Sequence, residues 1–302
     1  MKINKMLTTI DTHVCGEIFR IITYSPMQLT QIKSEENALT QQFSKGKALL
    51  LNEPRGHRGV NGCIVTPSNK ADYAVSFIHH ENEKHFSYSG LLATLTALLE
   101  TGNIQVKEDG IYHIETIKGT YPIHARFNNS SQGLELLQIE SDVCKLIEES
   151  ENYSLVEIDY SRRYVLFQLP KIIPEIDMAF LSDILKWGKQ AVNRLKETVH
   201  FEGVILAERI ADNEFKSVTF ERDGAILRSP GMDTTFALCT AFENGREPTE
   251  LVNRSIFGSE FRAKGVEGSE RRYSIQTRPF VTGEHQFIYD QEDPLEEGFL
   301  LK

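Results

Sequence analysis

The stretch SPGMDTTFALCTAFENG, residues 229–245, predicts a buried helix with defined ends. Small residues lead into it, Asp233 and Thr234 are residue types that cap helices, and Asn244-Gly245 is a stop signal. The first N–H groups of a helix have no partners inside the helix, so such a start is a natural pocket for a small anion. The pocket contains no strong nucleophile or base other than Asp233.

A second stretch, YSGLLATLTALLETG at residues 88–102, has the same design. Each begins with a small residue beside glycine and continues as a helix that is apolar over most of its circumference, which indicates burial. Short strand-like segments surround both helices, separated by turn residues such as NNSSQG at 128–133. A third helix is predicted at 178–195 from the helical spacing of its apolar residues.

The repeated pattern predicts an α/β (α+β) protein of two similar domains, each a curled sheet around a buried central helix. We expect the break between them near residues 128–133. If both helices direct their N-termini at one cleft, two sets of free N–H groups would hold a small carboxylate there.

Composition excludes several classes of function. The chain has 302 residues, 40% of them apolar and 25% charged, which is ordinary for a globular protein, and its formal charge of −10 argues against nucleic acid or an anionic membrane as a partner. No apolar run is long enough to span a bilayer. The four cysteines are far apart and form no CxxC pair, so we expect no metal site and a cytoplasmic protein.

Five segments together resemble the proline racemase family in residues, order and spacing: DTHVCGE (11–17), EPRGH (53–57), IHHE (78–81), RSP (228–230) and DPLEEGFLL (293–301). The resemblance covers nearly the whole chain. It implies the two-domain fold shared with diaminopimelate epimerase, a ligand cleft between the domains, and a C-terminal strand that returns to the first domain. We therefore expect a first domain at 1–130, completed by 285–302, and a second at 131–284.

The resemblance also implies a cofactor-independent chemistry at Cα. In the family, one cysteine at the start of each buried helix lies on each face of an imino acid. One thiolate takes the Cα proton and the opposite thiol returns one. Thiols suit this task because a helix N-terminus can lower their pKa.

The four positions that carry this chemistry are changed in this chain. The family's Met-Cys-Gly-His reads YSGL here, with Ser89 at the cysteine and Leu91 at the histidine. The family's Asp-Arg-Ser-Pro-Cys-Gly-Thr-Gly-Thr reads LRSPGMDTT, with Leu227 at the acidic position and Gly231 at the second cysteine. Gly231 has no side chain and cannot move a proton, so a two-base racemase is not expected.

Ser89 and Asp233 are the candidate catalytic groups that remain. Some family members use serine at the first position and some dehydratases keep one working cysteine, but a serine needs an activating neighbour. For Asp233 we favour an N-cap with its oxygens turned to its own helix; the alternative is a replacement base, or a group that selects a cationic or neutral ligand. By the resemblance, the ligand-binding residues are His80, Gly90, Leu91, Gly231, Met232 and Thr234.

Other polar and sulfur-bearing residues of these motifs are interpreted as structural. Asp11 and Arg55 are expected to stabilise turns, and one of His79 and His80 to line the site. Cys63 and Cys239 are expected to be buried apolar residues.

Two functions of different class remain open. The first is a binding or regulatory protein with the racemase fold, which holds a small amino- or imino-acid-like carboxylate between its domains and lacks proline racemase activity. The second is an altered one-base enzyme, similar to 3-hydroxyproline dehydratases or hydroxyproline epimerases, that uses Ser89 or Asp233. Both imply a small-molecule ligand with no nucleic acid or membrane partner, and family members are often homodimers.

Overall fold

Two compact units make up the chain, residues 1–137 with 278–302 and residues 138–277. The structure, a computed structural model, describes residues 3–24, 44–80, 86–128, 133–242, 250–290 and 292–301. The expected boundaries near 130 and 284 fall a few residues from those of the two units. Most of the expected turn at 128–133 and the expected stop at Asn244-Gly245 lie outside the described residues.

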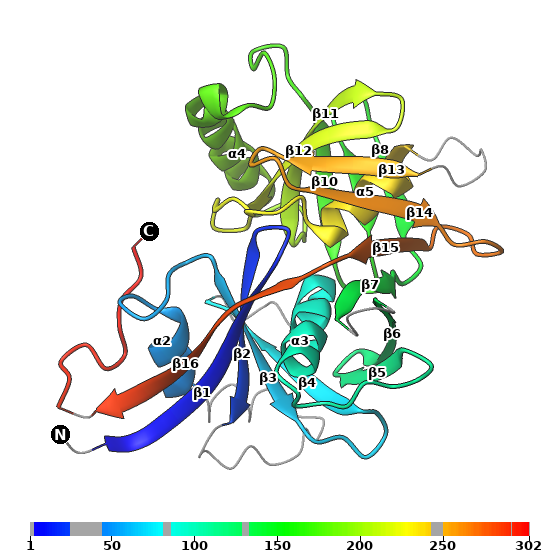
Figure 1. The fold of residues 1–302 in the computed structure, drawn as a ribbon. Helices are drawn as coiled ribbons and strands as arrows, with labels where there is room; N and C mark the ends of the chain where they lie inside the picture. The colour runs from blue at the N-terminus through cyan, green and yellow to red at the C-terminus, as the bar shows by residue number, and fades with distance from the viewer. Residues whose placement is uncertain are drawn as a thin grey trace. The chain divides into compact units, whose positions relative to one another are not determined.

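The sheet of unit 1 places the last strand of the chain beside the first (Figure 1). β16 pairs antiparallel with β1, with Leu7 opposite Phe287, whereas the β2–β3 and β4–β5 pairs are parallel. The strand order is β16 (Phe280–Asp290), β1 (Ile3–Val14), β2 (Glu17–Tyr24), β3 (Val60–Thr66), β4 (Tyr73–Ile78), β5 (Ile111–Thr116), β6 (Gly119–Phe127) and β7 (Leu134–Glu140).

The centre of unit 1 is helix α3 (Tyr88–Glu100), the buried helix predicted at 88–102. Every residue from Tyr88 to Leu98 is buried, because α3 contacts β1, β2, β3 and β16. The short helix α2 (Ser44–Leu51) contacts β3 and β16. The curled sheet around a central apolar helix therefore confirms the expected build of this unit.

The motifs near the two ends of the sequence hold unit 1 together. The backbone of Glu53 exchanges two hydrogen bonds of 2.9 Å with Phe299, and the Arg55 guanidinium forms an ion pair with Asp293. The buried ion pair between Arg20 and Asp11, at 2.7 Å, joins β2 to β1. The structural interpretation of Asp11 and Arg55 is confirmed.

Unit 2 repeats this design around helix α5 (Met232–Phe242), the core of the stretch at 229–245. α5 is largely buried and contacts six strands, β8, β9, β10, β13, β14 and β15. The strand order is β15 (Tyr273–Thr277), β14 (Glu260–Gly265), β13 (Leu251–Ser255), β12 (Glu214–Glu221), β11 (Gly203–Ala211), β10 (Arg163–Gln168), β9 (Ser154–Glu157) and β8 (Lys145–Glu149). The β10–β11 and β12–β13 pairs are parallel.

The third predicted helix is α4 (Leu181–Leu195), preceded by the single 3₁₀ turn η1 (Met178–Phe180). It is amphipathic and lies on β11 and β12, where it buries Ile184, Gly188, Ala191 and Val192. No helix in the described ranges is both long and apolar enough to cross a membrane.

Candidate functional site

The start of α3 is capped by its own chain. Ser87, with φ −149°, accepts a hydrogen bond from the N–H of Gly90 at 3.0 Å, and the N–H of Leu91 donates to the Ser87 carbonyl at 3.1 Å. The Leu91 side chain is fully buried in the core. The N–H groups of Gly90 and Leu91, two of the residues expected to bind the ligand, are therefore already engaged.

Ser89 occupies the first turn of α3. Its side chain is buried, with the residue 3% exposed, and its hydroxyl makes no hydrogen bond to a described residue. The nearby thiol of Cys63 donates to the Gly90 carbonyl at 3.8 Å, and burial raises its pKa to about 12. Cys63 is thus a buried apolar residue, as predicted, and supplies no thiolate for proton transfer.

His79 and His80 both follow the end of β4, so the alternation of side chains along a strand does not decide between them. His79 is buried, whereas His80 is half-buried and its Nε2 lies 3.2 Å from the carbonyl oxygen of His57. Burial, followed by the positive charge of Arg58, lowers the pKa of His80, which favours a neutral ring. This contact directs the His80 ring at the EPRGH loop.

The start of α5 is shaped by Gly231, whose φ of +72° is in the left-handed region. Its N–H donates to Ser229 Oγ at 3.1 Å, and its carbonyl accepts hydrogen bonds from the N–H and the hydroxyl of Thr235. A Cβ added at Gly231 would lie 2.8 Å from both Leu227 Cδ2 and Thr234 Oγ1. The second cysteine position is therefore closed to a side chain, both by backbone conformation and by packing.

Buried polar contacts hold this helix start in place. The hydroxyl groups of Thr234 and Thr219 are 2.6 Å apart, and the Nδ2 of the buried Asn253 donates to the Pro230 carbonyl at 3.0 Å. The Thr234 hydroxyl is thus engaged, and Met232 is buried. What the first turn of α5 can offer a ligand is its backbone N–H groups, which have no acceptor within the helix.

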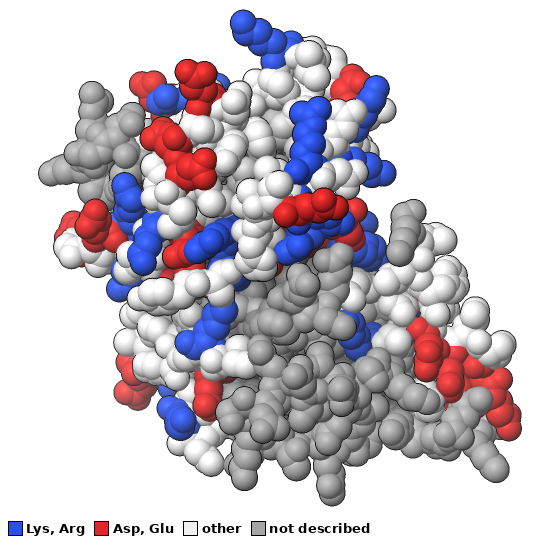
Figure 2. Space-filling model, turned by 180° about the vertical axis from the view of Figure 1, so that it is seen from behind, with Lys and Arg blue, Asp and Glu red and all other residues white. Residues whose placement is uncertain are grey.

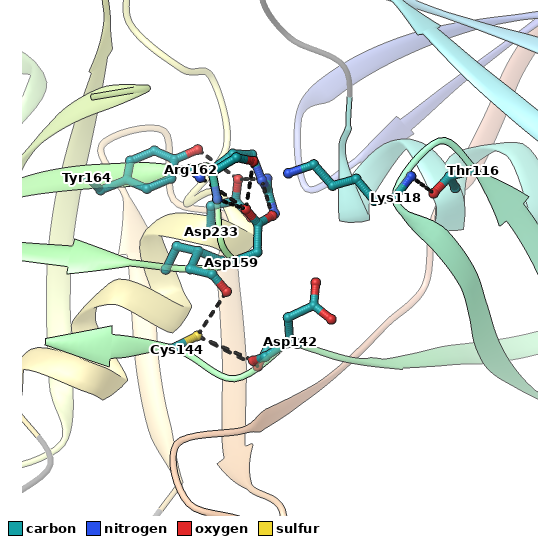
Figure 3. A network of polar contacts seen from close by, with 11 residues as sticks. Thr116, Lys118, Asp142, Cys144, Asp159, Arg162, Tyr164 and Asp233 are labelled. Atoms are coloured by element: carbon teal, nitrogen blue, oxygen red, sulfur yellow. Dashed lines mark hydrogen bonds and ion pairs between the residues drawn. The ribbon is translucent and has the colours of Figure 1, made fainter. Parts of the chain in front are cut away.

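Asp233 does not cap its own helix, so the favoured interpretation of this residue was wrong. One carboxylate oxygen, Oδ2, accepts hydrogen bonds from the Arg162 guanidinium and from the Tyr164 hydroxyl, the latter at 2.7 Å (Figure 3). The reason is positional: α5 begins at Met232, which makes Asp233 a helical residue, and β10 presents Tyr164 opposite it.

The Arg162 guanidinium bridges two carboxylates. Its Nε donates to Asp159 Oδ2 at 2.7 Å, while its NH1 donates to Asp233. Burial, with the nearby charge of Asp233, raises the pKa of Tyr164 well above its usual range, so its hydroxyl stays a donor. Asp233 Oδ2 is thus occupied by two donors, which argues against Asp233 as the replacement base.

Sequence reasoning missed Asp159, Arg162 and Tyr164. Their segment, DYSRRYV, has a local signal for a turn, because Asp159 Oδ1 accepts from the N–H groups of Ser161 and Arg162. Nothing in that signal connects the turn to a helix about seventy residues later. The contact of Arg162 with Asp233 depends on how β10 lies beside α5.

Two further cysteines, Cys144 and Cys239, are buried in unit 2. Burial raises the pKa of Cys144 to about 12, and Cys239 is buried on α5 as predicted. Within the described ranges, no three His, Cys, Asp or Glu side chains are placed to hold a metal ion. On the face shown in Figure 2, Asp and Glu side chains interrupt those of Lys and Arg.

Comparison with known proteins identifies the family of the chain. The family model described as proline racemase matches residues 9–300. A trans-3-hydroxy-L-proline dehydratase from Bacillus thuringiensis subsp. konkukian is 30% identical, with 100% of each chain covered. A 4-hydroxyproline 2-epimerase from Streptosporangium roseum is 25% identical over the same shares.

Among solved structures, a hydroxyproline epimerase from Agrobacterium vitis with bound trans-4-hydroxy-L-proline has a TM-score of 0.82 at 20% identity, covering 100% of this chain and 96% of its own. At 20% identity, the similarity of the two structures establishes a shared fold. Since the family model spans nearly all of the sequence and the relatives are covered from end to end, the chain belongs to the proline racemase family.

Proposed function

We propose that this protein binds a small amino- or imino-acid-like carboxylate and does not catalyse two-base racemisation. The observation that carries the proposal is Gly231, which cannot move a proton and whose neighbours Leu227 and Thr234 occupy the space of a side chain. Without a proton carrier at this position, a proton taken from one face of Cα has no donor on the opposite face.

Binding is supported by the retained start of α5. Its first N–H groups are unpaired within the helix and favour an anion, and the contacts of Thr234 and Asn253 fix their direction. The hydroxyproline epimerase of similar fold has trans-4-hydroxy-L-proline bound. We extend this class of ligand to the present chain.

The test is exchange of the Cα proton. The protein would be incubated in D₂O with L- and D-proline and with 3- and 4-hydroxyprolines, and each Cα signal followed by proton NMR. We expect no interconversion of stereoisomers, together with a higher melting temperature in the presence of proline or hydroxyproline. Interconversion of L- and D-proline would overturn the proposal, and so would the absence of binding to every one of these compounds.

A second candidate function is elimination of water from a 3-hydroxyproline, with Ser89 as the single base. The 30% identical trans-3-hydroxy-L-proline dehydratase and the buried place of Ser89 on the first turn of α3 favour it. As its alkoxide, Ser89 would take the Cα proton and pass it to the departing 3-hydroxyl, so that the C3–O bond breaks, water leaves and the alkoxide is restored. The expected product is a cyclic imine. Ser89→Ala should form none of it, and Ser89→Cys should form it faster than the wild-type protein because a thiol is more acidic than a hydroxyl.

The cytoplasmic location and the homodimer stay predictions. The location is supported by four free cysteines, as is usual in a reducing compartment. Analytical ultracentrifugation of the purified protein would decide between a monomer and a dimer.

A further inference from the structure

We draw no further inference here: the strongest candidate, the exposed apolar side chains of Val143, Ile147 and Tyr160 along β8 at the edge of the unit 2 sheet, carries no proposal because nothing in the described parts of the chain shows what covers them.

Discussion

Replacing Gly231 with alanine tests whether the second cysteine position is closed to any side chain. Two costs are expected. A non-glycine residue at φ +72° costs about 1–2 kcal/mol, and the new methyl group would lie 2.8 Å from Leu227 Cδ2 and from Thr234 Oγ1. Leu227 is half-buried and can move, but Thr234 is fixed by its contact with Thr219, so overpacking adds about 1–3 kcal/mol.

The structure offers a matched control in Gly268, whose φ of +71° is nearly the same and around which a Cβ would meet nothing within 4 Å. Gly268→Ala should therefore lower the free energy of unfolding by the backbone cost alone, about 1–2 kcal/mol, whereas Gly231→Ala should lower it by about 2–5 kcal/mol. Both positions lie in unit 2, so the comparison concerns one folding unit.

Urea denaturation followed by circular dichroism measures the free energy of unfolding of both variants. Adding Leu227→Ala to Gly231→Ala should recover part of the difference in stability between Gly231→Ala and Gly268→Ala. Equal losses for Gly231→Ala and Gly268→Ala would refute the packing argument. A stable Gly231→Cys variant that racemises proline would refute the conclusion that this position is closed to a side chain.

Three further predictions follow from buried groups. Because burial raises the pKa of Cys63 and Cys144 to about 12, iodoacetamide should label the half-buried Cys15 first and leave both buried thiols unmodified until urea is added, as read by mass spectrometry. The pKa of His80 is lowered from 6.5 in the folded state, so the unfolded state binds more protons near that pH. As the pH falls from about 7.5 to about 5.5, the free energy of unfolding of the wild-type protein should therefore decrease more steeply than that of His80→Gln. Equal slopes for the two proteins would contradict this. Arg162→Met leaves two carboxylates without their shared cation and should lower the free energy of unfolding by about 3–5 kcal/mol at neutral pH, whereas a loss no larger than that of a surface Arg→Met variant would show that the cluster is well solvated.

Much of the fold could be predicted from the sequence because local signals and long-range packing agree. The apolar circumference of residues 88–100 and 232–242 indicates burial, and both segments are the central helices of their units. The amphipathic spacing at 181–195 likewise predicts α4, a helix with one buried face. In each case, the spacing of apolar residues along the segment indicates which faces of the helix are buried.

The contacts of Asp233 could not be predicted in this way. A carboxylate at a helix start most often caps that helix, and only the position of β10 brings Arg162 and Tyr164 to it. Similarly, the left-handed turn at Gly231 is held by a local contact with Ser229 and by Asn253, which donates to the Pro230 carbonyl from 23 residues further along the chain.

The position of β16 has a consequence for the order in which the two units can form during synthesis. Unit 2 is one continuous segment, residues 138–277, and can fold once that segment has left the ribosome. The N-terminal segment of unit 1 is made before unit 2, but unit 1 also needs residues 278–302, because β16 covers the edge of β1. Of the two units, the one that is begun earlier is therefore completed later, and until then β1 presents an open strand edge to other nascent chains.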